Sequence, residues 1–190
     1  MNARSLIDGD APLPADWPRT LVIAVGNPSR GDDAAGPLLA ERLSSWLSDQ
    51  APSLQGTDPH HVTALCDQQL MVEHAYDLRG RDRVLFIDAA ARQGAPVHWQ
   101  RVEASAGGPA ISSHQCTPSQ LLHLCTHTLQ ITPPCAWSIN ALANWRASGA
   151  PASAAMQAAM NQAWDAIHAW VATPEANGPS VRQAAAPHHA

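Results

Sequence analysis

Residues 21–36, LVIAVGNPSRGDDAAG, contain the pattern from which the fold of this chain is predicted. The apolar run Leu21–Val25 leads directly into Gly-Asn-Pro, which is typical of a buried strand that ends at a turn. Pro28 cannot donate a hydrogen bond to a sheet, so the strand stops before it. The acids Asp32 and Asp33 come next. Apolar residues then recur at helical spacing: Leu38, Leu39, Leu43, Trp46 and Leu47. This order predicts a strand, a polar loop and a helix, with two carboxylates at the edge of an α/β sheet that usually binds ligands.

The remaining sequence continues to alternate strand patterns with helix patterns. We expect further strands at 61–66, 83–88, 97–102 and 135–142, the third of them near an edge. We expect helices at 33–48 with Asp32 as N-cap, at 69–78, from Thr117-Pro118 onward, and at 153–171. The inward face predicted for the last helix is Met156, Met160, Trp164, Ile167 and Val171.

This alternation predicts one α/β domain of three layers at residues 20–172. Its core is a mostly parallel, twisted sheet of about five strands with helices on both faces. We expect an extended arm at 1–19, which holds three Pro and no periodicity, and a disordered tail at 173–190.

Composition excludes several classes of function. The formal net charge of −5 and pI of about 6.0 argue against a nucleic-acid surface. All eleven basic residues are Arg, so neither Schiff-base catalysis nor a P-loop Lys is available. No GxSxG occurs, which argues against a serine hydrolase. The four Cys lack CxxC spacing, and we see neither a signal peptide nor a run long enough to span a membrane, so we expect a cytoplasmic protein with reduced thiols.

Two carboxylates and one imidazole form the main candidate site. Asp33 follows the first strand, Asp88 ends a second apolar strand, and His114 lies between a Gly/Ala/Ser-rich loop and a helix. At one sheet edge these groups would suit a divalent transition metal and leave coordination positions open. A plainer interpretation also fits the spacing, in which Asp33 favours a helix N-terminus, Asp88 ends a strand and His114 is a loop residue.

A second group of potential ligands lies at residues 114–127. His123 and His127 are four residues apart on one face of the predicted helix and could bind a metal. We favour the alternative, in which that face is solvated and Cys125 is a small core residue.

Three blocks of sequence resemble the hydrogenase maturation proteases. VIAVGNPSRGDDAAG at 22–36 is similar to the N-terminal signature of that family, and VLFIDAA at 84–90 to its second block. SSHQCTPSQLL at 112–122 resembles the third block, and the similarity extends over about residues 20–172. The resemblance implies that Asp33, Asp88 and His114 are the metal-binding and catalytic residues, although many members have Glu at the first position.

The resemblance also implies a function and a substrate. Such enzymes are endopeptidases that remove the C-terminal extension from the large-subunit precursor of a nickel-iron hydrogenase after nickel insertion. They have no tightly bound cofactor, since the nickel belongs to the substrate; cadmium or zinc could take its place in crystals. The metal could polarise the scissile carbonyl or activate water. The loop residues Gly26, Asn27 and Asp32 would hold the substrate or the loop itself.

One block departs from the family, and two other functions stay open. Members commonly carry a Gly-rich block with a Gly-Glu pair where this chain has SINALANWRASGAPAS at 138–153, which leaves open a divergent subfamily or a weakened enzyme. A non-catalytic nickel-binding chaperone for hydrogenase assembly would use the same Asp and His residues. Peptidyl-tRNA hydrolases share Gly-Asn-Pro, but their expected Arg-His-Asn is missing and the negative charge fits tRNA poorly.

Overall fold

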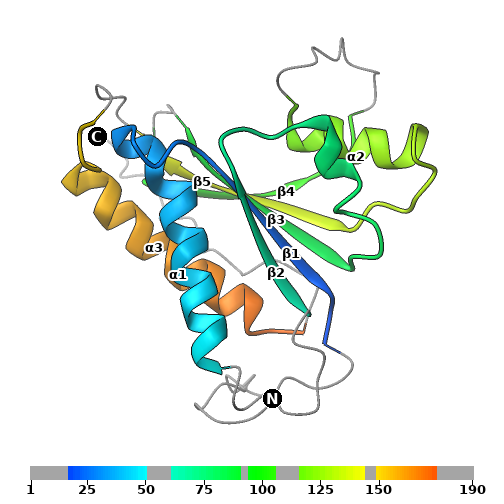
Figure 1. Cartoon of the computed structure of the whole chain (residues 1–190), viewed down its shortest axis with the longest axis horizontal. Coiled ribbons are helices and arrows are strands. Elements are labelled where there is room, and N and C mark those ends of the chain that lie inside the picture. The colour runs from blue at the N-terminus through cyan, green and yellow to red at the C-terminus, as the bar shows by residue number, and fades with distance from the viewer. Residues whose placement is uncertain (1–16, 51–60, 91–93, 106–115, 144–148, 175–190) are drawn as a thin grey trace, which may run out of the picture.

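A computed structural model describes residues 17–50, 61–90, 94–105, 116–143 and 149–174 (Figure 1). The strands are β1 (Thr20–Val25), β2 (Val62–Asp67), β3 (Arg83–Ala90), β4 (Val97–Val102) and β5 (Cys135–Leu142). The α-helices are α1 (Ala35–Gln50), α2 (Pro118–His127) and α3 (Ala154–Val171). Two short 3-10 helices are η1 (Gly31–Ala34) and η3 (Val72–Ala75).

The five strands form one sheet in the order β2-β1-β3-β5-β4. All neighbouring pairs are parallel except β4 and β5, which are antiparallel. The predicted α/β class is confirmed, and the two apolar runs form β1 and β3 in the interior of the sheet, as predicted. The strand at 97–102 is an edge strand, as expected from its alternating pattern.

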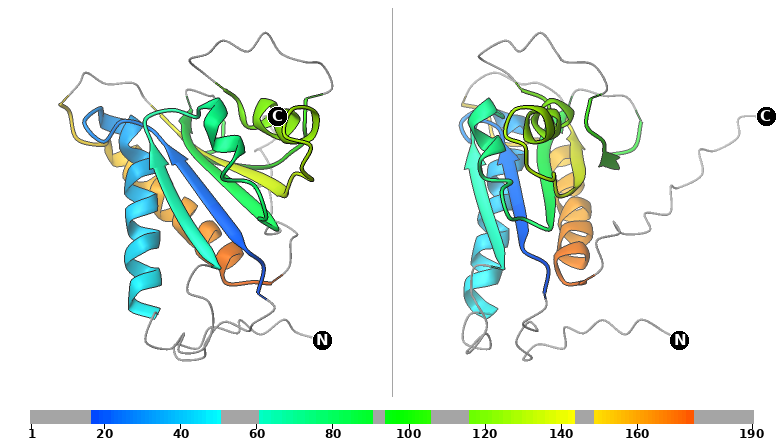
Figure 2. Two further views of the ribbon diagram at one scale, coloured as in Figure 1. Left: turned by 45° about the vertical axis from the view of Figure 1, so that its right-hand side comes forward. Right: turned by 90° about the vertical axis from the view of Figure 1, so that its right-hand side faces the viewer.

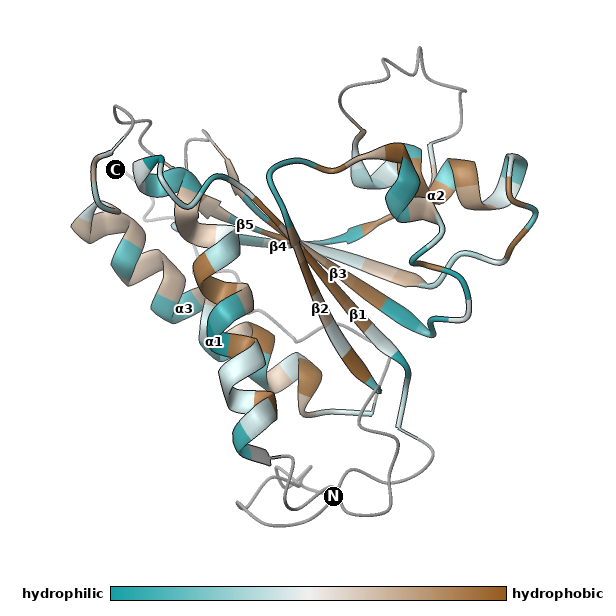
Figure 3. Cartoon of the chain, viewed as in Figure 1, coloured by the Kyte–Doolittle hydropathy of each residue, from teal (hydrophilic) through white to brown (hydrophobic). Residues whose placement is uncertain are grey.

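Helices cover both faces of the sheet, with α1 and α3 on one face and α2 on the other (Figures 1 and 2). Side chains alternate between these faces because successive strand residues point to opposite sides. Thus Val22 and Leu85 pack under α1 and α3, whereas Ile23 and Phe86 pack under α2. Apolar colouring is concentrated on the central strands, and the outer helix faces are more polar (Figure 3).

Two glycines allow β1 to meet the start of α1 closely. A Cβ on Gly26 would collide with the carbonyl oxygen of Asp33, and one on Gly36 would collide with that of Val25. Gly26 also has φ +141°, a conformation that favours glycine. The Gly spacing of the first sequence block therefore fixes the distance between the strand and the helix.

The C-terminus of α3 is tied to the sheet by a buried arginine. Arg83 donates hydrogen bonds to the carbonyl oxygens of Trp170, Val171 and Thr173, which lie in the last turn of α3 or just beyond it. Burial lowers the pKa of Arg83 to about 10, so its guanidinium stays charged at neutral pH. Cations suit this end of a helix because its last carbonyl groups lack intrahelical partners.

The chain before β1 is also packed where it is described. Trp17 is buried, and Arg19 pairs with Asp82 at 3.0 Å. Residues 17–19, assigned to an extended arm by the sequence, therefore contact the domain; residues 1–16 and 175–190 lie outside the described parts. None of the described helices combines the length and apolar character needed to cross a membrane.

Two expected helix boundaries are wrong. Asp32 is not the N-cap of the helix after β1, because η1 intervenes and α1 begins at Ala35. The helix expected at 69–78 is only the 3-10 turn η3 followed by turns. Met71 is extended and its N–H bonds the His74 ring at 2.9 Å, so helical backbone begins only after it.

The inward face of α3 is partly different from the predicted one. Met156, Ile167 and Val171 are buried as expected, but the buried tryptophan is Trp170 at 1% exposure. Met160 and Trp164 are half-buried and pack against the edge of the core, and the Arg42 guanidinium lies 4.5 Å from the Trp164 ring centroid. Small residues, Ala159 and Ala163, complete the buried stripe, which apolar spacing based on large side chains overlooks.

Candidate functional site

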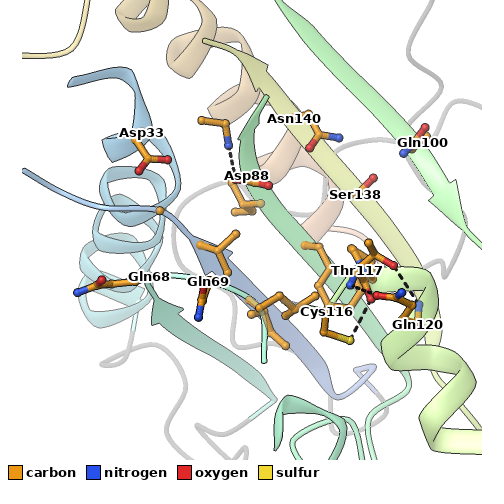
Figure 4. Close-up of a pocket in the computed structure, with 18 of the residues that line it drawn as sticks. Asp33, Gln68, Gln69, Asp88, Gln100, Cys116, Thr117, Gln120, Ser138 and Asn140 are labelled. Atoms are coloured by element: carbon orange, nitrogen blue, oxygen red, sulfur yellow. Dashed lines mark hydrogen bonds between the residues drawn. The ribbon is translucent and has the colours of Figure 1, made fainter. Parts of the chain in front are cut away.

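The candidate site lies between β1 and β3, where the order of the strands in the sheet reverses. From β1 the chain leads to β2 on one side, whereas β3 and the later strands lie on the other side. Ligands of open α/β sheets bind at such a switch point, outside the carboxyl ends of the strands. A pocket of about 800 Å³ is found here on the α2 face, and both Asp33 and Asp88 line it (Figure 4).

Asp33 is held at the pocket by the turn after β1. It belongs to η1, and its Oδ2 accepts a hydrogen bond from the backbone N–H of Asn27 at 3.2 Å. The Asn27 side chain in turn accepts from the Ser29 N–H at 2.9 Å. Asn27 therefore orders the loop itself, while Gly26 lines the pocket and permits the sharp turn.

Asp88 lies at the carboxyl end of β3, on the same face of the sheet as Phe86. Burial, with a smaller contribution from the nearby charge of Asp33, raises the pKa of this carboxyl to about 6. The N–H of Ala89, 2.7 Å from Oδ1, acts in the opposite direction. The two carboxylates therefore lie within electrostatic reach of each other, and Asp88 is largely shielded from solvent.

Asp32, assigned by the sequence to the substrate-holding loop, has a different environment. Its side chain is fully buried and contacts the start of α3. One carboxylate oxygen accepts from the Ser153 N–H at 2.7 Å and the other from the Ser153 hydroxyl at 3.0 Å. That hydroxyl also accepts from the N–H of Met156, as an N-cap does. Asp32 therefore joins the loop of Asp33 to α3 and does not line the pocket.

The third predicted ligand, His114, lies outside the described residues, as does Trp145 of the divergent block. Within the described ranges, no three His, Cys, Asp or Glu side chains are grouped to hold a metal. The ligand set Asp33, Asp88 and His114 therefore stays a prediction, of which the structure describes two members in one pocket.

His123 and His127 lie on α2 in the arrangement that we favoured, a polar helix face with Cys125 in the core. The rings of His123 and His127 stack at 4.1 Å between centroids, and Nδ1 of His123 lies 2.9 Å from the Ser105 carbonyl oxygen. Cys125 is fully buried in the core under α2. Cys116 lines the pocket, and burial raises the pKa of its thiol, which favours the unreactive protonated form.

Several pocket residues escaped the sequence analysis. Ser138 and Asn140 on β5 and Gln100 on β4 line the side of the pocket that lies beyond Asp88 from Asp33 (Figure 4). A period-two reading of 135–142 would have placed Ser138 and Asn140 together on one face. It could not have assigned that face to the pocket, because the assignment depends on the strand order.

Comparisons with solved structures identify the fold. The maturation protease HycI from Thermococcus kodakarensis aligns with a TM-score of 0.57 at 19% identity, over 82% of this chain and 93% of that one. The maturating endopeptidase HybD from E. coli aligns at 0.56 and 21% identity, over 78% and 89%. A hydrogenase 2 maturation peptidase from a Thaumarchaeota archaeon aligns at 0.52 and 22% identity, over 78% and 95%.

No protein-family model matches the sequence, and a comparison with curated proteins gives no match. The structural matches nevertheless cover most of both chains in each case. The chain therefore has the fold of the [NiFe] hydrogenase maturation proteases, and the resemblance of its three sequence blocks is confirmed at the level of the fold.

Proposed function

We propose that this protein is an endopeptidase that removes the C-terminal extension of a nickel-iron hydrogenase large-subunit precursor in the cytoplasm. The observation that carries the proposal is the pair Asp33 and Asp88, which share one pocket at the switch point of this fold. The structural neighbours are hydrogenase maturation proteases or peptidases, which supports this reaction, and the resemblance of the three sequence blocks suggests the substrate.

The nickel in this proposal is part of the substrate. Two neighbouring carboxylates are suitable ligands for a divalent cation, and a bound cation would relieve their mutual repulsion and favour ionised Asp88. His114 would be the third ligand, on the evidence of the sequence block that contains it. Three ligands leave positions for groups of the precursor, so recognition would depend on nickel that has already been inserted.

Hydrolysis then needs one water molecule beside the nickel. The water oxygen bonds to the scissile carbonyl carbon, the carbon–nitrogen bond breaks, and a proton passes to the leaving amine. A divalent ion can support this reaction by polarising the carbonyl group or by activating the water. The residues of this chain would supply the ligands and the positions of the reacting groups.

Mass spectrometry of the nickel-loaded precursor tests the peptidase activity. The wild-type protein should release the C-terminal tail, whereas Asp33→Asn and Asp88→Asn should not. Asp49→Asn is a matched control, because Asp49 is an exposed carboxylate on α1, and this variant should cleave like the wild type. An intact precursor bound stably by the wild-type protein would instead support the nickel-binding chaperone.

A further inference from the structure

A row of polar side chains lies beside Asp88 in the pocket. In the register of the sheet, Asp88 of β3 is opposite Asn140 of β5, and Ser138 is opposite Gln100 of β4. Ser138, Asn140 and Gln100 all point to the α2 face and line the pocket. Figure 4 shows Asp33 on one side of Asp88 and Asn140 on the other.

Ser138 is the strongest indication that this row has a ligand. The residue is only 5% exposed, and among the described residues its hydroxyl oxygen has no hydrogen-bond partner. A buried polar group without a hydrogen-bond partner destabilises a fold, so an apolar residue would be expected here for stability alone. The strand neighbours Ala136 on this face and Ile139 on the other are indeed apolar and buried.

The two amides beside Ser138 are also available. Within the described residues, the side chains of Asn140 and Gln100 form no hydrogen bonds, and no dashed line ends on them in Figure 4. The Gln120 amide differs, because its oxygen accepts from the Thr117 N–H at 2.7 Å in the cap of α2. Asn140 and Gln100 thus keep both their donors and their acceptors for a ligand.

The chemistry of this row matches a peptide main chain. A side-chain amide offers one carbonyl acceptor and an N–H donor, which are the groups that complement a peptide unit, and a hydroxyl can do either. A free phosphate or a nucleotide would need cations, but the row contains none. The pocket volume of about 800 Å³ is also large enough for a short extended segment.

We propose that Ser138, Asn140 and Gln100 form a subsite that binds the main chain of the substrate segment next to the scissile bond. The proposal rests on the proposed peptidase function for the position of that bond at Asp33 and Asp88. Recognition through the main chain makes the segment's backbone N–H and C=O groups essential, while its side chains can vary.

Peptide binding to an inactive protein tests the subsite separately from cleavage. The probe is a fluorescein-labelled synthetic peptide that covers the precursor's C-terminal tail and the residues before it, with binding to Asp88→Asn protein measured by fluorescence anisotropy. Adding Ser138→Ala and Asn140→Ala should weaken binding about 10-fold, the loss expected for two hydrogen bonds. Adding Ser45→Ala and Gln162→Ala, which remove a hydroxyl and an amide from exposed positions of α1 and α3, should leave the affinity unchanged.

Backbone-modified probes identify the group that is recognised. N-methylation at one peptide position should weaken binding to the Asp88→Asn protein but cause no further loss when Ser138 and Asn140 are also replaced. Equal binding by the two proteins, or no binding at all, would overturn the subsite. Binding with the expected losses, but no cleavage by the wild type, would retain the subsite and reject the peptidase function.

In the wild-type background the same two substitutions should raise KM for the precursor and leave kcat close to its original value. Ser138→Ala alone should not lower the melting temperature, because it removes a buried hydroxyl that has no hydrogen-bond partner among the described residues. A lower melting temperature together with an unchanged KM would show that Ser138 has a structural role and would contradict the proposal.

Discussion

At the scale of single residues, the environment of Asp88 has a measurable effect on stability. Its ordinary pKa of 3.8 rises to about 6 in the folded protein, mainly through burial. The folded protein therefore keeps this proton between about pH 4 and pH 6, where the unfolded chain has released it. The contribution of Asp88 to the free energy of unfolding thus falls as the pH rises through this window and stays constant above it.

Asp88→Asn should remove this titration. The free energy of unfolding of the metal-free variant, minus that of the wild type, should rise by up to about 3 kcal/mol as the pH rises from about 4 to about 6. Urea denaturation of both proteins across this range measures the difference. A difference that does not change with pH would contradict the raised pKa.

Asp32 should act together with the cap of α3. Asp32→Asn should lower the free energy of unfolding by about 2 kcal/mol, because Ser153 would lose its charged acceptor. With Ser153→Ala the two effects should be non-additive, with a coupling of about 1 kcal/mol in a double-mutant cycle. Thr117→Ala, at the cap of α2, is the control and should be additive with Asp32→Asn. Additive effects in both pairs would mean that the contact between Asp32 and Ser153 does not stabilise the protein.

At the scale of elements, the turn from β1 to α1 depends on a close backbone approach. Gly26→Ala should destabilise the protein by about 3 kcal/mol or more, because the new Cβ would collide with the Asp33 carbonyl oxygen. Gly94→Ala is a matched control, since Gly94 has a similar φ of +123° but open space around it. Gly94→Ala should lower the free energy of unfolding by about 1–2 kcal/mol, which is the effect of the backbone conformation alone. Similar losses in both variants, measured by chemical denaturation, would rule out the collision.

The packing of α3 on the sheet gives a second prediction at this scale. Trp170→Ala should lower the free energy of unfolding by about 3–5 kcal/mol, because Trp170 is buried and lies under the Arg83 guanidinium. Trp164→Ala should cost less, about 1 kcal/mol, since this ring is only half-buried at the edge of the core and also contacts Arg42. Thermal denaturation of the two variants gives the comparison. A larger loss for Trp164 would reverse the orientation assigned to the helix.

At the scale of the whole molecule, the sequence predicts those features that depend on local pattern. Continuous apolar runs identified β1 and β3 as interior strands, because strands buried on both faces need apolar residues at every position. Thr117 and Pro118 marked the start of α2, where the Thr117 hydroxyl indeed accepts from the Gln120 N–H. The placement of Asp33 and Asp88 in one pocket followed from the position of Asp33 after β1 and of Asp88 near the carboxyl end of β3.

Features that depend on contacts between distant segments were not predictable in this way. Asp32 binds Ser153, which is 121 residues away, and no local signal distinguishes that role from an N-cap. Ser138, Asn140 and Gln100 become neighbours of Asp88 only through the order β3-β5-β4. After β2, the apolar spacing predicts a longer helix than the 3-10 turn η3. Spacing alone does not reveal that Met71 has an extended backbone conformation.

The central claim of the proposed function is that the pocket at Asp33 and Asp88 acts only on a precursor that already contains nickel. The most direct test is to incubate the wild-type protein with nickel-loaded and with nickel-free large-subunit precursor and to compare the masses of the products. We expect loss of the C-terminal tail from the nickel-loaded precursor and an intact nickel-free precursor. Equal trimming of both forms would contradict recognition through nickel, and trimming of neither form would contradict the peptidase function itself.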